Sequence, residues 1–114
     1  MAPKKNPLKL NNLQLRTLML AQVIAREPDL ARIDPESGDA ELLHLPHAHG
    51  DHVHIGPYVV SARDASGFDN PAVWVALERK GLARRSSPLT MTLTKAGIAY
   101  DTGLGDAFVE QSDH

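Results

Sequence analysis

The 114-residue chain contains no cysteine, one tryptophan, two tyrosines and two phenylalanines. Without cysteine it has no disulfide, thiolate metal ligand or cysteine nucleophile, which agrees with a reducing compartment. Because aromatic rings are so few, aliphatic side chains and alanine have to fill the core. No apolar run reaches membrane-spanning length, and the basic start continues into an asparagine-containing segment that is unlike a signal peptide. We therefore expect a cytoplasmic protein that does not interact with a membrane.

Acidic and basic residues are concentrated in different parts of the chain, although the formal net charge is only −2. Residues 27–52 hold seven acids and one base, residues 63–95 hold six bases and three acids, and the tail from Asp101 is purely acidic. This segregation is compatible with one anion-binding face. It is a weaker signal for nucleic-acid binding than a strongly basic domain would give.

The first part of the chain predicts an arm, a helix and a loop. Residues 1–11 carry two prolines and three lysines and predict a flexible basic arm. Asn11 or Asn12 is placed to cap a helix, and the apolar residues that follow recur at helical spacing, which predicts the main core helix. Pro28 ends this helix, and residues 28–40 predict an acidic loop.

The second part predicts a helix, a basic hairpin and a closing helix. Residues 58–66 predict a short helix, or a strand that passes into a helix, and Val73, Trp74 and Leu77 form the buried face of the next helix. Strands at residues 82–85 and 90–93 form the hairpin. The capping and breaking residues of these elements are Asp69 or Asn70, Pro71, Gly81 and Thr94.

The sequence LERKGLARR followed by LTMTLTKAGIAY resembles the winged helix-turn-helix domains of bacterial regulators, particularly the MarR-like group. The resemblance covers about residues 58–101 and is carried by Leu77, Glu78, Lys80, Gly81, Leu82, Arg85, Leu93, Thr94 and Gly97. It implies a recognition helix that enters the major groove of double-stranded DNA and a basic wing beside it. By this resemblance Arg84, Arg85 and Lys95 contact phosphate, and Arg79 approaches a base edge or the backbone.

The expected recognition helix has an unusual composition for a base-reading surface. If its apolar face is buried, the groove-facing residues are Asp69, Ala72, Val75, Ala76 and Arg79. Base edges are usually read by polar side chains, whereas alanine and valine offer only methyl contacts and an aspartate repels phosphate. The helix is therefore buried, covered by the inserted hairpin or used to bind a protein, and sequence-specific reading of DNA is less expected than DNA binding itself. The simplest alternative for the basic residues is a solvated helix end and hairpin.

A histidine-rich segment, HLPHAHGDHVHIG, predicts a second hairpin with a turn at Gly50 and Asp51. Its strands, residues 41–45 and 53–55, pair in a register that puts four imidazoles on one face. These four are His47, His49, His52 and His54. They suit Zn²⁺ or Ni²⁺, or without metal a pH-sensitive cluster. The alternative is a solvated loop without fixed ligand geometry.

The same segment also matches the HxHxDH signature of metallo-β-lactamases, but that fold needs a far longer chain and further downstream ligands. No other catalytic constellation is present, so we expect no enzyme.

The sequence predicts an α+β fold, with a single winged helix-turn-helix domain over residues 12–102 that carries the histidine-rich hairpin as an insertion at 41–56. Residues 1–11 form the arm and 103–114 an acidic tail. The expected function is DNA-binding transcriptional regulation, as a monomer or homodimer; a protein-interaction module and a metal- or pH-responsive module are the alternatives.

Overall fold

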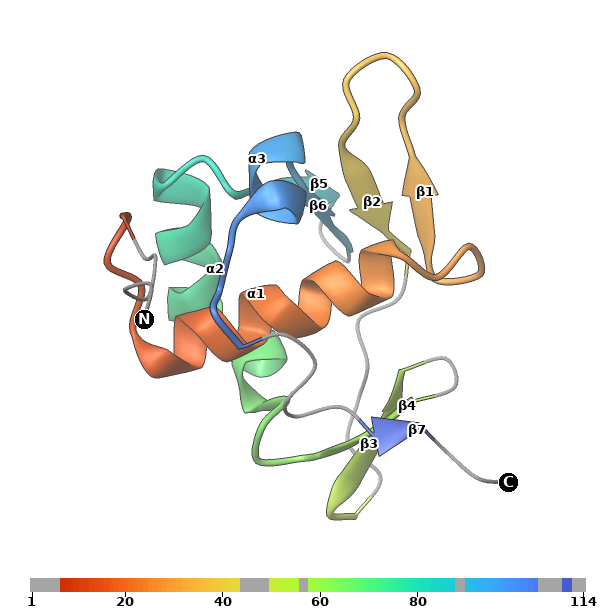
Figure 1. The fold of residues 1–114 in the computed structure, drawn as a ribbon, viewed down its shortest axis with the longest axis vertical. Helices are drawn as coiled ribbons and strands as arrows, with labels where there is room; N and C mark the ends of the chain where they lie inside the picture. The colour runs from red at the N-terminus through yellow and green to blue at the C-terminus, as the bar shows by residue number, and fades with distance from the viewer. Residues whose placement is uncertain (1–6, 44–49, 56–57, 88–89, 105–109, 112–114) are drawn as a thin grey trace.

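The computed structural model describes residues 7–43, 50–55, 58–87, 90–104 and 110–111 (Figure 1). These residues form an α+β fold, which confirms the predicted class. The helices are α1 (Asn12–Ala25), α2 (Pro71–Arg79), α3 (Lys95–Ala99) and the 3-10 helix η1 (Ser66–Asp69). The larger antiparallel sheet has the order β1 (Ala31–Ile33), β2 (Ala40–Leu42), β6 (Thr90–Leu93), β5 (Ala83–Ser87). The smaller sheet has the order β3 (His52–Ile55), β4 (Tyr58–Ser61), β7 (Glu110–Gln111).

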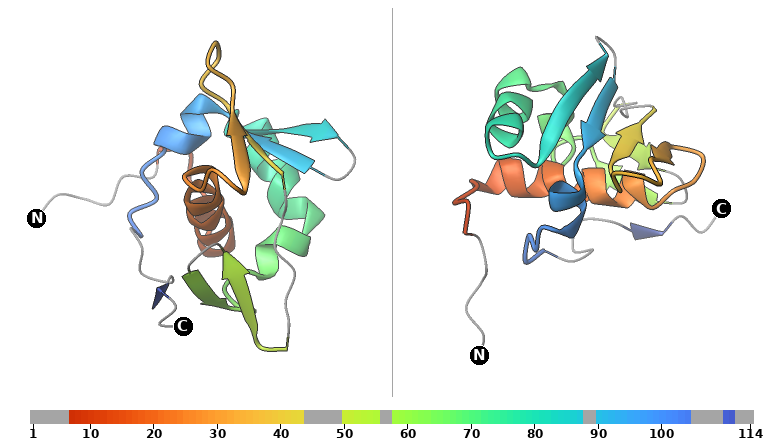
Figure 2. Two further views of the ribbon diagram at one scale, coloured as in Figure 1. Left: turned by 90° about the vertical axis from the view of Figure 1, so that its right-hand side faces the viewer. Right: turned by 90° about the horizontal axis from the view of Figure 1, so that it is seen from above.

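Helix α1 is the central element, and it lies between the larger sheet and the β3–β4 hairpin (Figures 1 and 2). It begins with a capping box, in which the Asn11 side chain accepts the Gln14 N–H and the Gln14 side chain accepts the Asn11 N–H. Leu18, Leu20 and Ile24 are completely buried. The predicted main core helix and its cap are thus confirmed.

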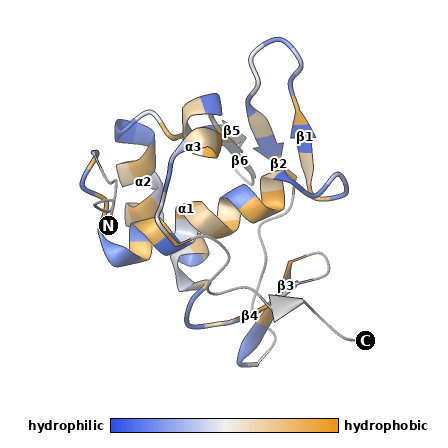
Figure 3. Cartoon of the chain, viewed as in Figure 1, coloured by the Kyte–Doolittle hydropathy of each residue, from blue (hydrophilic) through white to orange (hydrophobic). Residues whose placement is uncertain are grey.

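The four-stranded sheet corrects the prediction of a loop over residues 28–40, because β1 and the start of β2 lie there. The two strands form a hairpin that projects from the body of the molecule (Figure 1), and its connection is hydrophilic (Figure 3). Each strand has only three residues, too few for a clear alternating pattern. The β1–β2 hairpin is fixed in the sheet because β2 pairs with β6, which lies far along the chain, as in the pair Glu41 and Thr92.

The predicted pairing of residues 41–45 with residues 53–55 is wrong. Strand β2 has β1 on one side and β6 on the other, so both of its hydrogen-bonding edges are occupied. Strand β3 pairs with β4 instead, with His52 opposite Ser61 and His54 opposite Val59. Residues 44–49 lie outside the described residues.

Of the two alternatives expected for residues 58–66, the short helix is wrong and the strand is confirmed, since β4 lies there. Residues 58–66 form β4 and a turn, and η1 begins at Ser66. The first helix of the expected helix-turn-helix is therefore a four-residue 3-10 helix. It is held in place because the Trp74 indole N–H donates to the Phe68 carbonyl, 3.0 Å away.

Helix α2 begins and ends where the sequence predicts. The Asn70 side chain caps it by accepting the Ala72 N–H, and Pro71 is its first residue. Gly81 follows the C-cap residue Lys80 with φ +74°, a conformation that favours glycine. The expected inner face is confirmed, since Val73, Trp74 and Leu77 are buried.

Thr94 fixes the hairpin and the closing helix relative to α2. Its hydroxyl accepts the Gly97 N–H at 3.1 Å and donates to the Gly81 carbonyl at 2.7 Å. One side chain therefore caps α3 and also binds the glycine that ends α2. Gly97 is buried where α3 crosses the chain at Leu82, and a Cβ atom there would overlap the Leu82 carbonyl oxygen.

Residues near the start of the chain pack on the core. Leu10 is 4% exposed, and the Leu8 N–H donates to the Tyr100 hydroxyl at 3.2 Å. Part of the predicted flexible arm is thus attached to the segment that follows α3. None of the described helices combines the length and the apolar character needed to cross a bilayer.

Candidate functional site

The outer face of α2 is open and carries the side chains expected there. Asp69, Ala72 and Arg79 are exposed, Val75 is 41% exposed, and Ala76 is half-buried. This face ends at the turn that leads into β5, against which α2 packs. It therefore presents methyl groups over most of its length and a guanidinium at its C-terminal end.

Arg84 and Arg85, both expected to contact phosphate, lie on opposite faces of the larger sheet. They are consecutive residues of β5, so their side chains alternate. Arg84 is opposite Thr92 and Arg85 is opposite the buried Met91. Arg85 therefore lies on the side where α1 and α2 pack, and Arg84 lies on the outer side.

Asp39 joins Arg84 to the N-terminus of α3. Its carboxylate accepts the Lys95 backbone N–H at 2.8 Å and the Arg84 guanidinium at 3.3 Å. The Asp39 side chain is only 17% exposed, against 56% for that of Arg84. The contact holds the β1–β2 hairpin against the rest of the sheet and neutralises much of the Arg84 charge.

The four predicted nucleic-acid contacts thus fall into two groups. Asp39 binds the guanidinium of Arg84 but only the backbone N–H of Lys95, which is itself exposed. Arg79 and Arg85 are exposed, and within the described part of the chain no ion pair engages either of them. Sequence reasoning missed Asp39 because its partners are 45 and 56 positions away.

Two of the four predicted metal ligands can be placed. His52 and His54 share one face of β3, with ring centroids 4.9 Å apart and planes at 86°. His52 Nδ1 lies 3.3 Å from an Asp51 carboxylate oxygen. Over the described ranges no three histidine, aspartate or glutamate side chains are grouped to hold a metal ion. His47 and His49 lie outside these ranges, so the Zn²⁺ or Ni²⁺ site stays a prediction.

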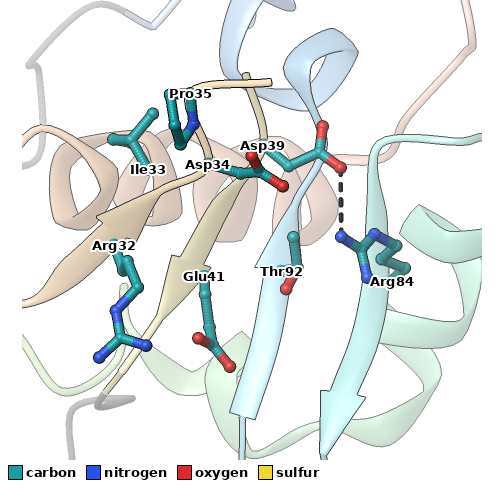
Figure 4. A pocket seen from close by; sticks show the side chains of 8 residues that line it. All are labelled: Arg32, Ile33, Asp34, Pro35, Asp39, Glu41, Arg84 and Thr92. Atoms are coloured by element: carbon teal, nitrogen blue, oxygen red, sulfur yellow. Dashed lines mark hydrogen bonds and ion pairs between the residues drawn. The ribbon is translucent and has the colours of Figure 1, made fainter. Parts of the chain in front are cut away.

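A cavity of about 360 Å³ opens on the outer side of the larger sheet. Its lining comprises Arg32, Ile33, Asp34, Pro35, Asp39, Glu41, Arg84 and Thr92 (Figure 4). The β-sheet register places one residue from each strand in a row across its floor, in the order Arg32, Glu41, Thr92 and Arg84. The first three of these residues gave no functional signal along the sequence.

Neither the scan against protein-family models nor the searches of curated proteins and of solved structures finds a match for this chain. Its function must therefore be inferred from its own residues and their geometry.

Proposed function

We propose that this chain is a winged-helix domain that binds double-stranded DNA through α2 and the β5–β6 hairpin, as a bacterial-type regulator does. The connectivity supports this, because β6 lies between β2 and β5, and α2 leads directly into the hairpin. The observation that carries the proposal is the exposure of Arg79 and Arg85 at the junction of α2 and β5. Exposed guanidinium groups that no carboxylate of the described residues engages are available to phosphate.

The same surface argues for contacts to the DNA backbone with little reading of base sequence. Ala72 and Val75 can touch a thymine methyl group but cannot form hydrogen bonds with base edges. Asp69, exposed before the start of α2, disfavours a close phosphate there. Phosphate contacts fix the position of a protein on a duplex, whereas base contacts give specificity. We therefore expect similar affinity for different duplex sequences.

Substitution of Arg85 by alanine is expected to flatten the salt dependence of binding to a random-sequence duplex. Each lost phosphate contact lowers the slope of log K against log salt concentration by about 0.9. Arg79→Ala should have a similar effect. Fluorescence anisotropy of a labelled duplex, measured over a series of salt concentrations, gives the slope for each variant.

Arg84→Ala is the matched control, because it removes the same charge from the neighbouring position on the opposite face. Arg84 is engaged by Asp39, so this variant should retain nearly the wild-type slope. Equal effects of Arg84→Ala and Arg85→Ala would contradict the proposed face. Absence of salt-dependent binding in the wild type would contradict DNA binding altogether.

One observation favours a second function, which is binding of a protein partner through α2. Val75 is 41% exposed, and the adjacent Ala72 extends the apolar surface without adding a hydrogen-bonding group. Such a surface suits a partner helix or loop better than a polar groove. This second function predicts that the wild-type chain does not bind duplex DNA. It also predicts that a substitution of Val75 abolishes binding of the protein partner.

A further inference from the structure

The cavity on the outer side of the larger sheet is separate from the proposed DNA-binding face. The side chains on its floor alternate with those that pack on α1, since neighbouring residues of a strand point to opposite faces. Glu41 and Thr92 therefore face the cavity, whereas Leu42 and Met91 are buried in the core. A molecule bound in the cavity would contact β1, β2, β6 and Arg84 without touching α2.

The charged groups of the cavity are only partly matched to one another. Its lining contains three carboxylates and two guanidinium groups. Asp39 and Arg84 form an ion pair. Arg32 and Glu41 are neighbours across β1 and β2 (Figure 4), but in the described residues neither takes part in an ion pair or a side-chain hydrogen bond.

Asp34 adds a carboxylate that remains ionised. The Glu36 N–H, which donates to Asp34 Oδ1 at 2.9 Å, is the main reason that the pKa of this carboxyl lies below its ordinary value, and Ser37 contributes in the same direction. The cavity therefore has a net charge of −1, with Glu41 and Asp34 as its acidic groups outside the Arg84 ion pair.

Thr92 provides a polar group on the cavity floor. The residue is 3% exposed, and over the described ranges its hydroxyl has no hydrogen bond. In those ranges every fully buried side-chain oxygen or nitrogen has a hydrogen-bond partner. Because the Thr92 hydroxyl has none, it must be open to the cavity. An almost buried hydroxyl without a protein partner is available to a ligand.

We propose that this cavity binds a small molecule with two cationic groups and one carboxylate, the charge pattern of a basic α-amino acid. The ligand carboxylate pairs with Arg32, and its α-ammonium group pairs with Glu41. The Thr92 hydroxyl donates to the ligand carboxylate or accepts from the α-ammonium group. The distal cation lies toward Asp34, and the aliphatic part of the ligand packs on Ile33 and Pro35. The ligand charge of +1 balances the net charge of the cavity, whose volume suits a small molecule.

The inference is tested by titrating the ¹⁵N-labelled full chain with L-arginine and following backbone amide shifts. Saturable shifts are expected in β1, β2 and β6. L-citrulline, which has nearly the same shape without the distal charge, should bind more weakly. Glu41→Gln, which keeps the side-chain shape, should weaken L-arginine binding by about tenfold or more, because one charge-assisted interaction is lost.

Glu36→Gln serves as the control, since it removes the same charge from the same hairpin but from a residue outside the cavity lining. It should leave L-arginine affinity nearly unchanged. Three results would overturn the inference: no saturable shifts at millimolar L-arginine, equal affinity for L-citrulline, or equal effects of Glu41→Gln and Glu36→Gln. Neither the inference nor its test depends on DNA binding.

Discussion

Replacing Trp74 with alanine is expected to lower the free energy of unfolding by about 3 to 5 kcal/mol. The indole is 4% exposed and packs beside the Phe68 ring, with centroids 6.0 Å apart. Its N–H also satisfies the Phe68 carbonyl, so the substitution leaves both a cavity and an unpaired acceptor. Domains of this size are stable by only about 5 to 15 kcal/mol. Urea unfolding followed by circular dichroism measures the loss without relying on tryptophan fluorescence.

Val75→Ala is the matched control, because Val75 is the next residue of α2 but is 41% exposed. Its effect on the free energy of unfolding should stay within about 0.5 kcal/mol. Trp74 lies on the buried face of α2 and anchors it to η1, whereas Val75 lies on the proposed binding face. Comparable losses in the two variants would mean that the faces of α2 are assigned incorrectly.

Gly97→Ala is expected to destabilise the protein by about 2 to 3 kcal/mol. Helix propensity alone predicts the opposite sign, since alanine is favoured over glycine within a helix by about 1 kcal/mol. Here the added Cβ atom would overlap the Leu82 carbonyl oxygen and come within 2.9 Å of Leu93 Cδ1. Because Leu82 directly precedes β5 and Leu93 is the last residue of β6, relief of the overlap requires α3 to move away from the hairpin. Urea unfolding gives the sign directly.

Ala96→Gly, at the exposed neighbouring position of α3, isolates the effect of helix propensity. It should cost about 1 kcal/mol or less, with no steric contribution. If Gly97→Ala instead stabilised the protein, the close contact between α3 and the Leu82 backbone would be refuted. The contact also gives a physical reason for glycine at position 97, three residues after the helix cap Thr94.

The features that the sequence predicts well depend on neighbouring residues. The capping residues Asn11, Asn70 and Thr94 act on backbone groups two or three positions away. Gly81 ends α2 through its own backbone conformation. The buried face of α2 follows from helical periodicity alone. For these reasons the helix boundaries in the second half of the chain were predictable.

The features that were missed depend on residues far apart in the chain. Strand β2 takes its structure from β6, and this pairing occupies the edge that was assigned to the histidine-rich hairpin. The role of Asp39 arises from contacts with Arg84 and Lys95. A pattern of residue types does not specify which distant strand provides a partner, so the sheet cavity and the ion pair of Arg84 with Asp39 needed the three-dimensional structure.

We propose that DNA lies against α2 and the Arg85 side of the β5–β6 hairpin. Titration of the ¹⁵N-labelled protein with a random-sequence duplex, followed through backbone amide shifts, tests it most directly. We expect shifts that are concentrated between Ala72 and Arg85 and that diminish as salt is added. Shifts concentrated in β1 and β2, or no shifts at low salt, would contradict it.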